Sequence, residues 1–138
     1  MDSHLPDIEI LEPVFSVCRV ADYSGVDPDR HFSFTGCTDQ EKSLVCPTES
    51  VPENPVRRDD GWRAFRICGE LDFSLIGILS RIADILASRR IGILAISTYN
   101  TDYILTRAGQ FDQALSALKE AGYTIRTQNK DETEATPC

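Results

Sequence analysis

Two short stretches of the chain hold residues suited to binding the two charged ends of a small zwitterion. The first, residues 70–77, places Asp72 and Ser74 at the entry to a helical pattern, with Gly77 inside its first turn. Gly77 has no side chain to keep a ligand away. Free backbone amides at a helix start, with the helix dipole behind them, favour a bound carboxylate. The candidate ligand-binding residues of this stretch are Asp72, Phe73, Ser74, Leu75, Ile76 and Gly77.

The second stretch, residues 97–102 (STYNTD), separates two strand patterns. Hydroxyl and carboxylate oxygens accept hydrogen bonds from an ammonium or guanidinium group, so this turn suits the positive end of a ligand. Its candidate ligand-binding residues are Ser97, Thr98, Thr101 and Asp102.

Both stretches also have an ordinary structural interpretation. Asp72 and Ser74 are of the types that cap helices, and Gly77 can be a packing contact against a sheet. Asn100 and Asp102 are normal residues of a hairpin turn. The residues alone leave the structural and the ligand-binding interpretation open.

Other reactive residues favour neither catalysis nor metal binding. His4 and His31 lie far apart, with no acidic or sulfur partner at ligand spacing, so no metal site is expected. A nucleophilic cysteine needs a neighbouring base and a positive setting. None of the five cysteines has either locally, so we expect no enzyme activity and no cofactor; they are Cys18, Cys37, Cys46, Cys68 and Cys138.

Strand and helix patterns alternate between residues 62 and 126. A strand at 62–68 precedes a helix at 71–90, whose apolar positions recur every three or four residues. The apolar run 91–98 predicts a strand buried on both faces, and a second strand resumes near residue 103. The order is completed by a helix at 110–121, a left-handed cap at Gly122 and a strand at 123–126. The fold class predicted is α+β, a ferredoxin-like βαββαβ unit with an antiparallel sheet and two helices on one face.

The N-terminal half has strand patterns but little helix. Residues 14–20 alternate as a strand, and residues 31–36 and 42–47 form a hairpin pattern. An edge strand is expected near residues 8–11, and residues 48–61 predict a surface connection with one helical turn. The predicted domains are a degenerate half at 1–61, the ferredoxin-like domain at 62–127 and a disordered acidic tail at 128–138.

The stretch GELDFSLIGILSRIADILASRRIGILAISTYNTDYILTR resembles the ACT-domain family, in particular the small bacterial branch related to the CASTOR arginine sensors. The resemblance rests on Asp72, Phe73 and Ser74, on Gly77, and on ISTYNTDYIL; the segment SLVCPTESV resembles the branch more weakly. It implies a tandem of two ACT units that binds an amino acid at the strand-to-helix loop. By analogy with the arginine sensors, Asp102 is the cation partner.

Composition restricts the partners. Fourteen basic residues against 22 acidic ones give a net charge of −8, which repels phosphate backbones and anionic membranes. Neither a signal peptide nor an apolar run of about 20 residues is present, so a cytoplasmic protein is expected.

Three functions are compared. The favoured one is a small-molecule sensor, with an amino acid as the ligand, that regulates an unidentified protein partner in trans. The alternative is an interaction or dimerisation module that keeps the ACT fold without a ligand, because exposed sheet edges favour homodimers. An enzyme is disfavoured, since no catalytic constellation can be assembled.

Overall fold

The computed structural model describes residues 5–53, 55–69 and 77–128, which fall into two compact units. Residues 1–12 and 63–138 make up the first, here called the helical unit, and residues 13–62 make up the second, the hairpin unit. Strand β5 (Arg57–Ile67) contributes its first residues to the hairpin unit and its last residues to the helical unit. Residues 1–12 thus cluster with the C-terminal part of the chain, whereas the predicted boundary groups them with the N-terminal half.

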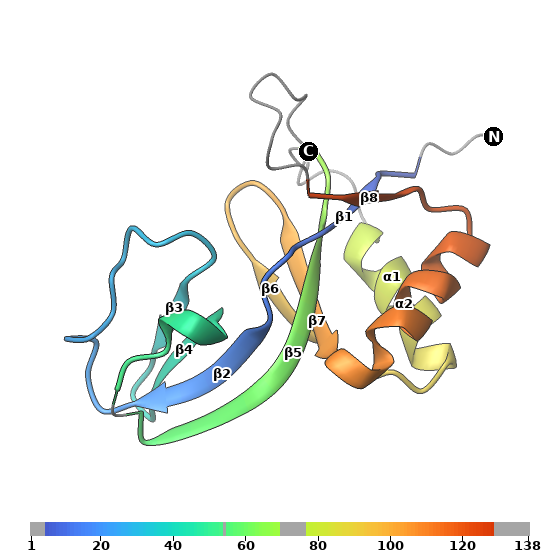
Figure 1. The fold of residues 1–138 in the computed structure, drawn as a ribbon. Coiled ribbons are helices and arrows are strands. Elements are labelled where there is room, and N and C mark those ends of the chain that lie inside the picture. Colours follow the sequence, from blue (N-terminus) through green and yellow to red (C-terminus); the bar gives the residue numbers. More distant parts are fainter. Residues whose placement is uncertain (1–4, 54, 70–76, 129–138) are drawn as a thin grey trace. The chain divides into compact units, whose positions relative to one another are not determined.

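The helical unit consists of a sheet with two helices packed on it (Figure 1). Its strands follow the order β6-β7-β5-β1-β8. The α+β, ferredoxin-like fold class is confirmed, with one strand added to the βαββαβ plan. Besides the end of β5, its elements are β1 (Ile8–Ile10), α1 (Ile78–Ser88), β6 (Leu94–Ser97), β7 (Asp102–Arg107), α2 (Ala108–Glu120) and β8 (Ile125–Thr127).

The added strand is β1, and the prediction that it lies at an edge is wrong. Ile8 pairs with Ile67 of β5 on one side, antiparallel, and with Ile125 of β8 on the other, parallel. Ile8 is completely buried as a result. Three residues are too few for a sequence pattern to distinguish an internal strand from an edge strand.

The predicted apolar faces of the two helices form the core of the helical unit. Helix α1 contributes Ile82 and Leu86, and α2 contributes Phe111 and Leu118, all of them buried. The sheet contributes Ile8, Phe65, Ile67 and Ile104. Burying a side chain of this kind stabilises the fold by about 1.5–3 kcal/mol relative to leaving it exposed.

The start of α1 and the burial of β6 differ from the prediction. Helix α1 begins at Ile78, and Gly77 is its N-cap with φ of 89°, so Gly77 does not lie inside the first turn. A Cβ at Gly77 would meet no atom within 4 Å, so left-handed backbone geometry, and not packing, calls for glycine there. Strand β6 is not buried on both faces, because Ala95 and Ser97 are exposed.

The hairpin unit is a sheet of order β3-β4-β2-β5, built from β2 (Phe15–Val20), β3 (Phe34–Cys37), β4 (Lys42–Pro47) and the start of β5. The predicted hairpin is therefore confirmed. Residues 57–61, predicted as part of a connection, belong to β5, and residues 57–59 pair with β2. The expected helical turn is the 3-10 helix η1 (Thr48–Ser50), and no side chain of the described residues caps it.

Two free thiols belong to the core of the hairpin unit. Cys18 and Cys46 are buried with Val20 and Leu44. Burial raises the pKa of Cys18 and raises the pKa of Cys46 to about 11. Cys37, by contrast, is a free and exposed thiol.

We expect these thiols to differ in reactivity. In the native protein at pH 8, iodoacetamide should modify Cys37 at least about tenfold faster than Cys18 or Cys46, because a buried thiol of raised pKa forms little thiolate. Peptide mass spectrometry of timed samples measures each site, and labelling in denaturant is the control. Equal native rates at Cys37 and Cys46 would contradict this packing.

A second prediction concerns the end of α2. The amides of Gly122 and Tyr123 donate to the carbonyls of Lys119 and Leu118, which is a Schellman motif, and Gly122 has φ of 107°. A Cβ there would also lie 3.3 Å from Leu5 Cδ1. Gly122→Ala should lower the free energy of unfolding by about 1–2 kcal/mol, measured by urea denaturation.

Gly109 is the matched control, because it lies within α2 at ordinary backbone angles and a Cβ added to it would meet no atom within 4 Å. Gly109→Ala should be neutral or stabilising by up to about 1 kcal/mol. Equal effects at the two glycines would refute the role assigned to Gly122.

Candidate functional site

The turn between β6 and β7 is closed by its own hydrogen bonds. The backbone N–H of Thr98 donates to the carbonyl of Thr101 at 2.9 Å, and the Thr98 hydroxyl donates to the same carbonyl at 3.0 Å. The Thr101 amide lies 3.4 Å from Thr98 Oγ1. The ordinary interpretation of this stretch as a hairpin turn is therefore confirmed, and its own hydrogen bonds define the shape of the turn.

The strand residues on either side of the turn bring a carboxylate and a hydroxyl together. Ser97 and Asp102 are direct cross-strand partners, and Ser97 Oγ donates to Asp102 Oδ1 at 2.5 Å. Side chains alternate along a strand, so Asp102 shares its face of the sheet with Ile104, the face that the helices cover. The described contacts of Asp102 use Oδ1, which leaves Oδ2 for a second donor.

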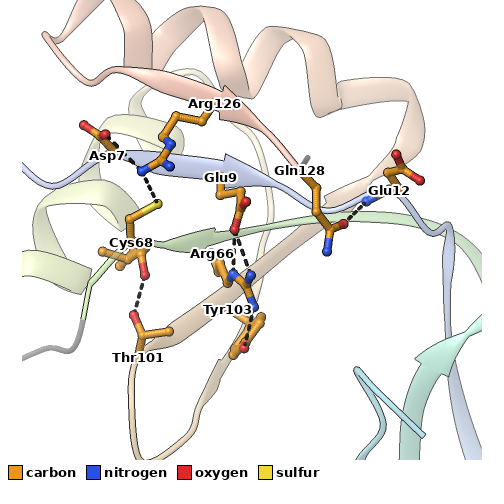
Figure 2. A network of polar contacts seen from close by, with 10 residues as sticks. Asp7, Glu9, Glu12, Arg66, Cys68, Thr101, Tyr103, Arg126 and Gln128 are labelled. Carbon is orange, nitrogen blue, oxygen red and sulfur yellow. Dashed lines mark hydrogen bonds and ion pairs between the residues drawn. The ribbon is translucent and has the colours of Figure 1, made fainter. Parts of the chain in front are cut away.

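Thr101 ties the turn to the end of β5. Its buried hydroxyl donates to the carbonyl of Ile67 at 2.7 Å, as Figure 2 shows. Ile67 is the last residue of β5, so the hairpin turn lies beside the point where the strand-to-helix stretch begins. The second candidate stretch is thus hydrogen-bonded to the end of β5.

Of the first candidate stretch, only Gly77 lies within the described residues. Asp72, Phe73, Ser74, Leu75 and Ile76 lie outside them. On one side Gly69 has φ of 86°, and on the other Gly77 has φ of 89° and precedes α1. Within the described residues, no side chain caps the first turn of α1. Figure 1 places the end of β5, the β6–β7 turn and the start of α1 at the same end of the helical unit.

An ion-pair cluster on the other face of this sheet was not predicted. Glu9 and Arg66 face each other across β1 and β5, with Arg66 Nη2 2.8 Å from Glu9 Oε1, and Arg66 also donates to the Tyr103 hydroxyl at 3.3 Å (Figure 2). Burial acts to lower the pKa of Arg66, but hydrogen bonds with Tyr103 and Glu9 outweigh it and raise that pKa. The alternation of Glu9 with Ile8 and Ile10 was the available signal. We interpret the cluster as structural, because its guanidinium already has carboxylate and hydroxyl partners.

Metal-ligand clusters and membrane-spanning helices are both absent from the described part of the chain. It contains no group of three or more His, Cys, Asp or Glu residues arranged to hold a metal ion. None of its helices is both long enough and apolar enough to cross a bilayer.

A comparison with known families found one match, in the middle and later part of the chain. Residues 57–120 match the model of the ACT domain family. The match covers the end of the hairpin unit, both helices and the candidate turn. No curated protein sequence matches the chain.

Several solved structures are similar to this chain over most of its length. The protein Atu0741 from Agobacterium tumefaciens is 25% identical with a TM-score of 0.81, and the similarity covers 94% of this chain and 98% of that one. A Vibrio cholerae protein of unknown function, described as a possible transport protein, is 21% identical with a TM-score of 0.64, over 83% and 88% of the two chains. The ligand-free regulatory subunit of aspartate kinase from Thermus thermophilus is 11% identical with a TM-score of 0.58, over 86% and 99%. At these identities the last two show a shared fold alone.

The bond from Thr101 to β5 can be tested directly. Thr101→Val keeps the shape of the side chain and removes the donor to the Ile67 carbonyl, so the free energy of unfolding should fall by about 1–2 kcal/mol. Thr124→Val is the control, because Thr124 is an exposed threonine of the same unit, and its effect should stay within about 0.5 kcal/mol. Urea denaturation measures both variants. If Thr101→Val lowers the free energy of unfolding no more than Thr124→Val does, the bond from Thr101 to Ile67 does not anchor the turn.

Proposed function

We propose, on the basis of the ACT-domain match over residues 57–120, that this protein is a regulatory module that binds a small molecule, and that the ligand is an amino acid. The observation that carries the proposal is the juxtaposition of a carboxylate-bearing turn with the end of β5, the strand that precedes α1 in the chain. Thr101 makes that connection through its bond to Ile67.

The chemistry of the two parts is complementary. The first amides of α1 have no side-chain cap among the described residues and lie at the positive end of the helix dipole, which favours the carboxylate of a ligand. Asp102, held by Ser97, offers an oxygen to an ammonium or guanidinium group. Asp72, Phe73, Ser74, Leu75 and Ile76, which join β5 to this helix, are proposed to complete the site together with Gly77, Ser97 and Thr98.

The narrower proposals concern the family branch, the location and the partner. We propose that the chain is related to the CASTOR-type arginine sensors, and that Asp102 takes the cationic group of the ligand. We further propose that the protein acts in the cytoplasm on a partner in trans, with no enzyme activity of its own.

An interaction module is the second candidate, favoured by the edge of the sheet. Among the described residues, β6 pairs with β7 alone, so its other edge is open to a strand from a second molecule. Open edges of this kind promote pairing between chains. A homodimer formed there would need no ligand.

A ligand screen separates the two candidates. With each standard amino acid added at millimolar concentration, at least one should raise the melting temperature, by about 5–15 °C at a hundredfold excess over its dissociation constant. Asp102→Asn should raise the dissociation constant of that ligand by about tenfold or more, because the substitution removes a charge-assisted contact. Differential scanning fluorimetry provides the measurement.

The control is Asp84→Asn, which removes a carboxylate from the exposed side of α1 and should leave the response unchanged. A screen in which no amino acid shifts the melting temperature would count against sensing. An Asp102→Asn protein whose melting temperature shifts as much as that of Asp84→Asn would also count against sensing. Either result would favour the interaction module.

A further inference from the structure

Cys68 differs from the other cysteines that the structure describes, because its sulfur is in a disulfide bond. The other three, Cys18, Cys37 and Cys46, are free thiols. The chain has five cysteines, so Cys138 is the one left as the partner of Cys68. Cys138 lies outside the described residues, and its pairing with Cys68 is assigned by elimination.

The sulfur of Cys68 lies at a point where three neighbouring strands of the helical unit are connected. Cys68 directly follows β5, and its amide donates to the carbonyl of Asp7, the residue before β1, at 2.8 Å. Arg126 of β8 places Nη1 4.0 Å from Cys68 Sγ and 3.5 Å from Asp7 Oδ2 (Figure 2). A bond at Cys68 therefore acts on the shared end of β5, β1 and β8.

The setting of Cys68 favours reaction of its thiolate once the bond is open. A guanidinium close to a cysteine stabilises the thiolate, which is the form that attacks disulfides. Asp7 shares the guanidinium of Arg126, so the positive charge is partly compensated. Cys18 and Cys46 lie in the opposite setting, since burial raises the pKa of both thiols. Of these three cysteines, Cys68 is therefore the one suited to thiol–disulfide exchange.

A bond between residues 68 and 138 also stabilises the folded chain. It closes a long loop, and cross-links across long loops remove the most conformational freedom from the unfolded chain. In a reducing compartment such bonds are usually transient and serve redox sensing. The bond thus combines a large effect on stability with a chemistry that the surroundings can reverse.

We infer that Cys68 and Cys138 form a redox switch, which is closed by a low-molecular-weight disulfide such as oxidised glutathione. The thiolate of Cys68 attacks the glutathione disulfide, which gives a mixed disulfide and one glutathione. The thiolate of Cys138 then attacks the Cys68 sulfur and releases the second glutathione. Two cysteine thiols are oxidised, one glutathione disulfide is reduced, and the two cysteine protons end on the two glutathione thiols. Excess glutathione reverses both steps.

The switch lies beside the site of the proposed function. The carbonyl of Ile67, the residue before Cys68, accepts the hydroxyl of Thr101. The candidate stretch 70–77 follows Cys68 after one residue, Gly69. Closing the bond restrains the end of β5 and should change the affinity of that site, a consequence that rests on the proposed function.

Disulfide mapping and thermal unfolding test the switch on the full chain without any ligand. The protein is equilibrated with excess oxidised or reduced glutathione, and one portion is denatured in iodoacetamide for peptide mass spectrometry. Oxidation should leave residues 68 and 138 in one linked pair of peptides, and reduction should leave all five cysteines alkylated. Oxidation should also raise the melting temperature by at least about 5 °C.

Variants identify the cysteines responsible. Cys68→Ser and Cys138→Ser should each melt at the same temperature in oxidised and in reduced glutathione. Cys37→Ser is the control, because Cys37 is an exposed free thiol, and this variant should keep the full shift. The inference is overturned if no linked pair forms in oxidised glutathione, if reduced glutathione fails to open the bond, or if Cys138→Ser keeps the shift of the control.

These outcomes are separable from those of the proposed function, because neither measurement involves a ligand. A chain that forms the bond and shows the shift, yet binds no amino acid, retains the switch and loses the sensor. Asp102→Asn, which should impair the proposed ligand site, should leave the response to glutathione unchanged.

Discussion

Strand β5 is the element on which the rest of the structure depends, because both units take hydrogen bonds from it. Its first residues pair with β2, its last residues pair with β1, and β7 also pairs with it. Phe65 and Ile67 of the same strand are completely buried in the core of the helical unit. A change that shortened or shifted β5 would therefore disturb both sheets at once, since a slip of one residue turns every side chain to the other face.

Much of the helical unit could be predicted from local patterns, because the signals that define its helices lie within the helices themselves. The period of Ile78, Ile82 and Leu86 determines the buried face of α1, and Gly122 marks the end of α2 by a conformation that other residues rarely adopt. The position of β1 between β5 and β8 could not be predicted in this way. It depends on partners at residues 67 and 125, far away in the chain, and a three-residue pattern does not indicate them.

The candidate site shows the same division between local and distant information. The sequence identified the turn through Ser97 and Asp102, which are close neighbours, and the bond between them is in the structure. The bond from Thr101 to Ile67 spans 34 residues of sequence and had no local signal. The start of α1 was placed too early, because the apolar period continues through Leu75 while the backbone requires the left-handed turn at Gly77. Asp72–Ile76 remain predictions.

The bond between Thr101 and Ile67 also suggests how occupancy of the turn would reach the rest of the molecule. A ligand that fixes Asp102 restrains the β6–β7 turn, and the buried hydroxyl of Thr101 passes that restraint to the end of β5. Because β5 pairs with β2 at its other end, a change in the stability of β5 also changes the stability of that pairing. Ligands that bind only the folded state stabilise every element coupled to their site. In the proposed regulatory module, ordering of β5 and its neighbours by a ligand would itself be a difference that a partner protein could recognise, without a large movement.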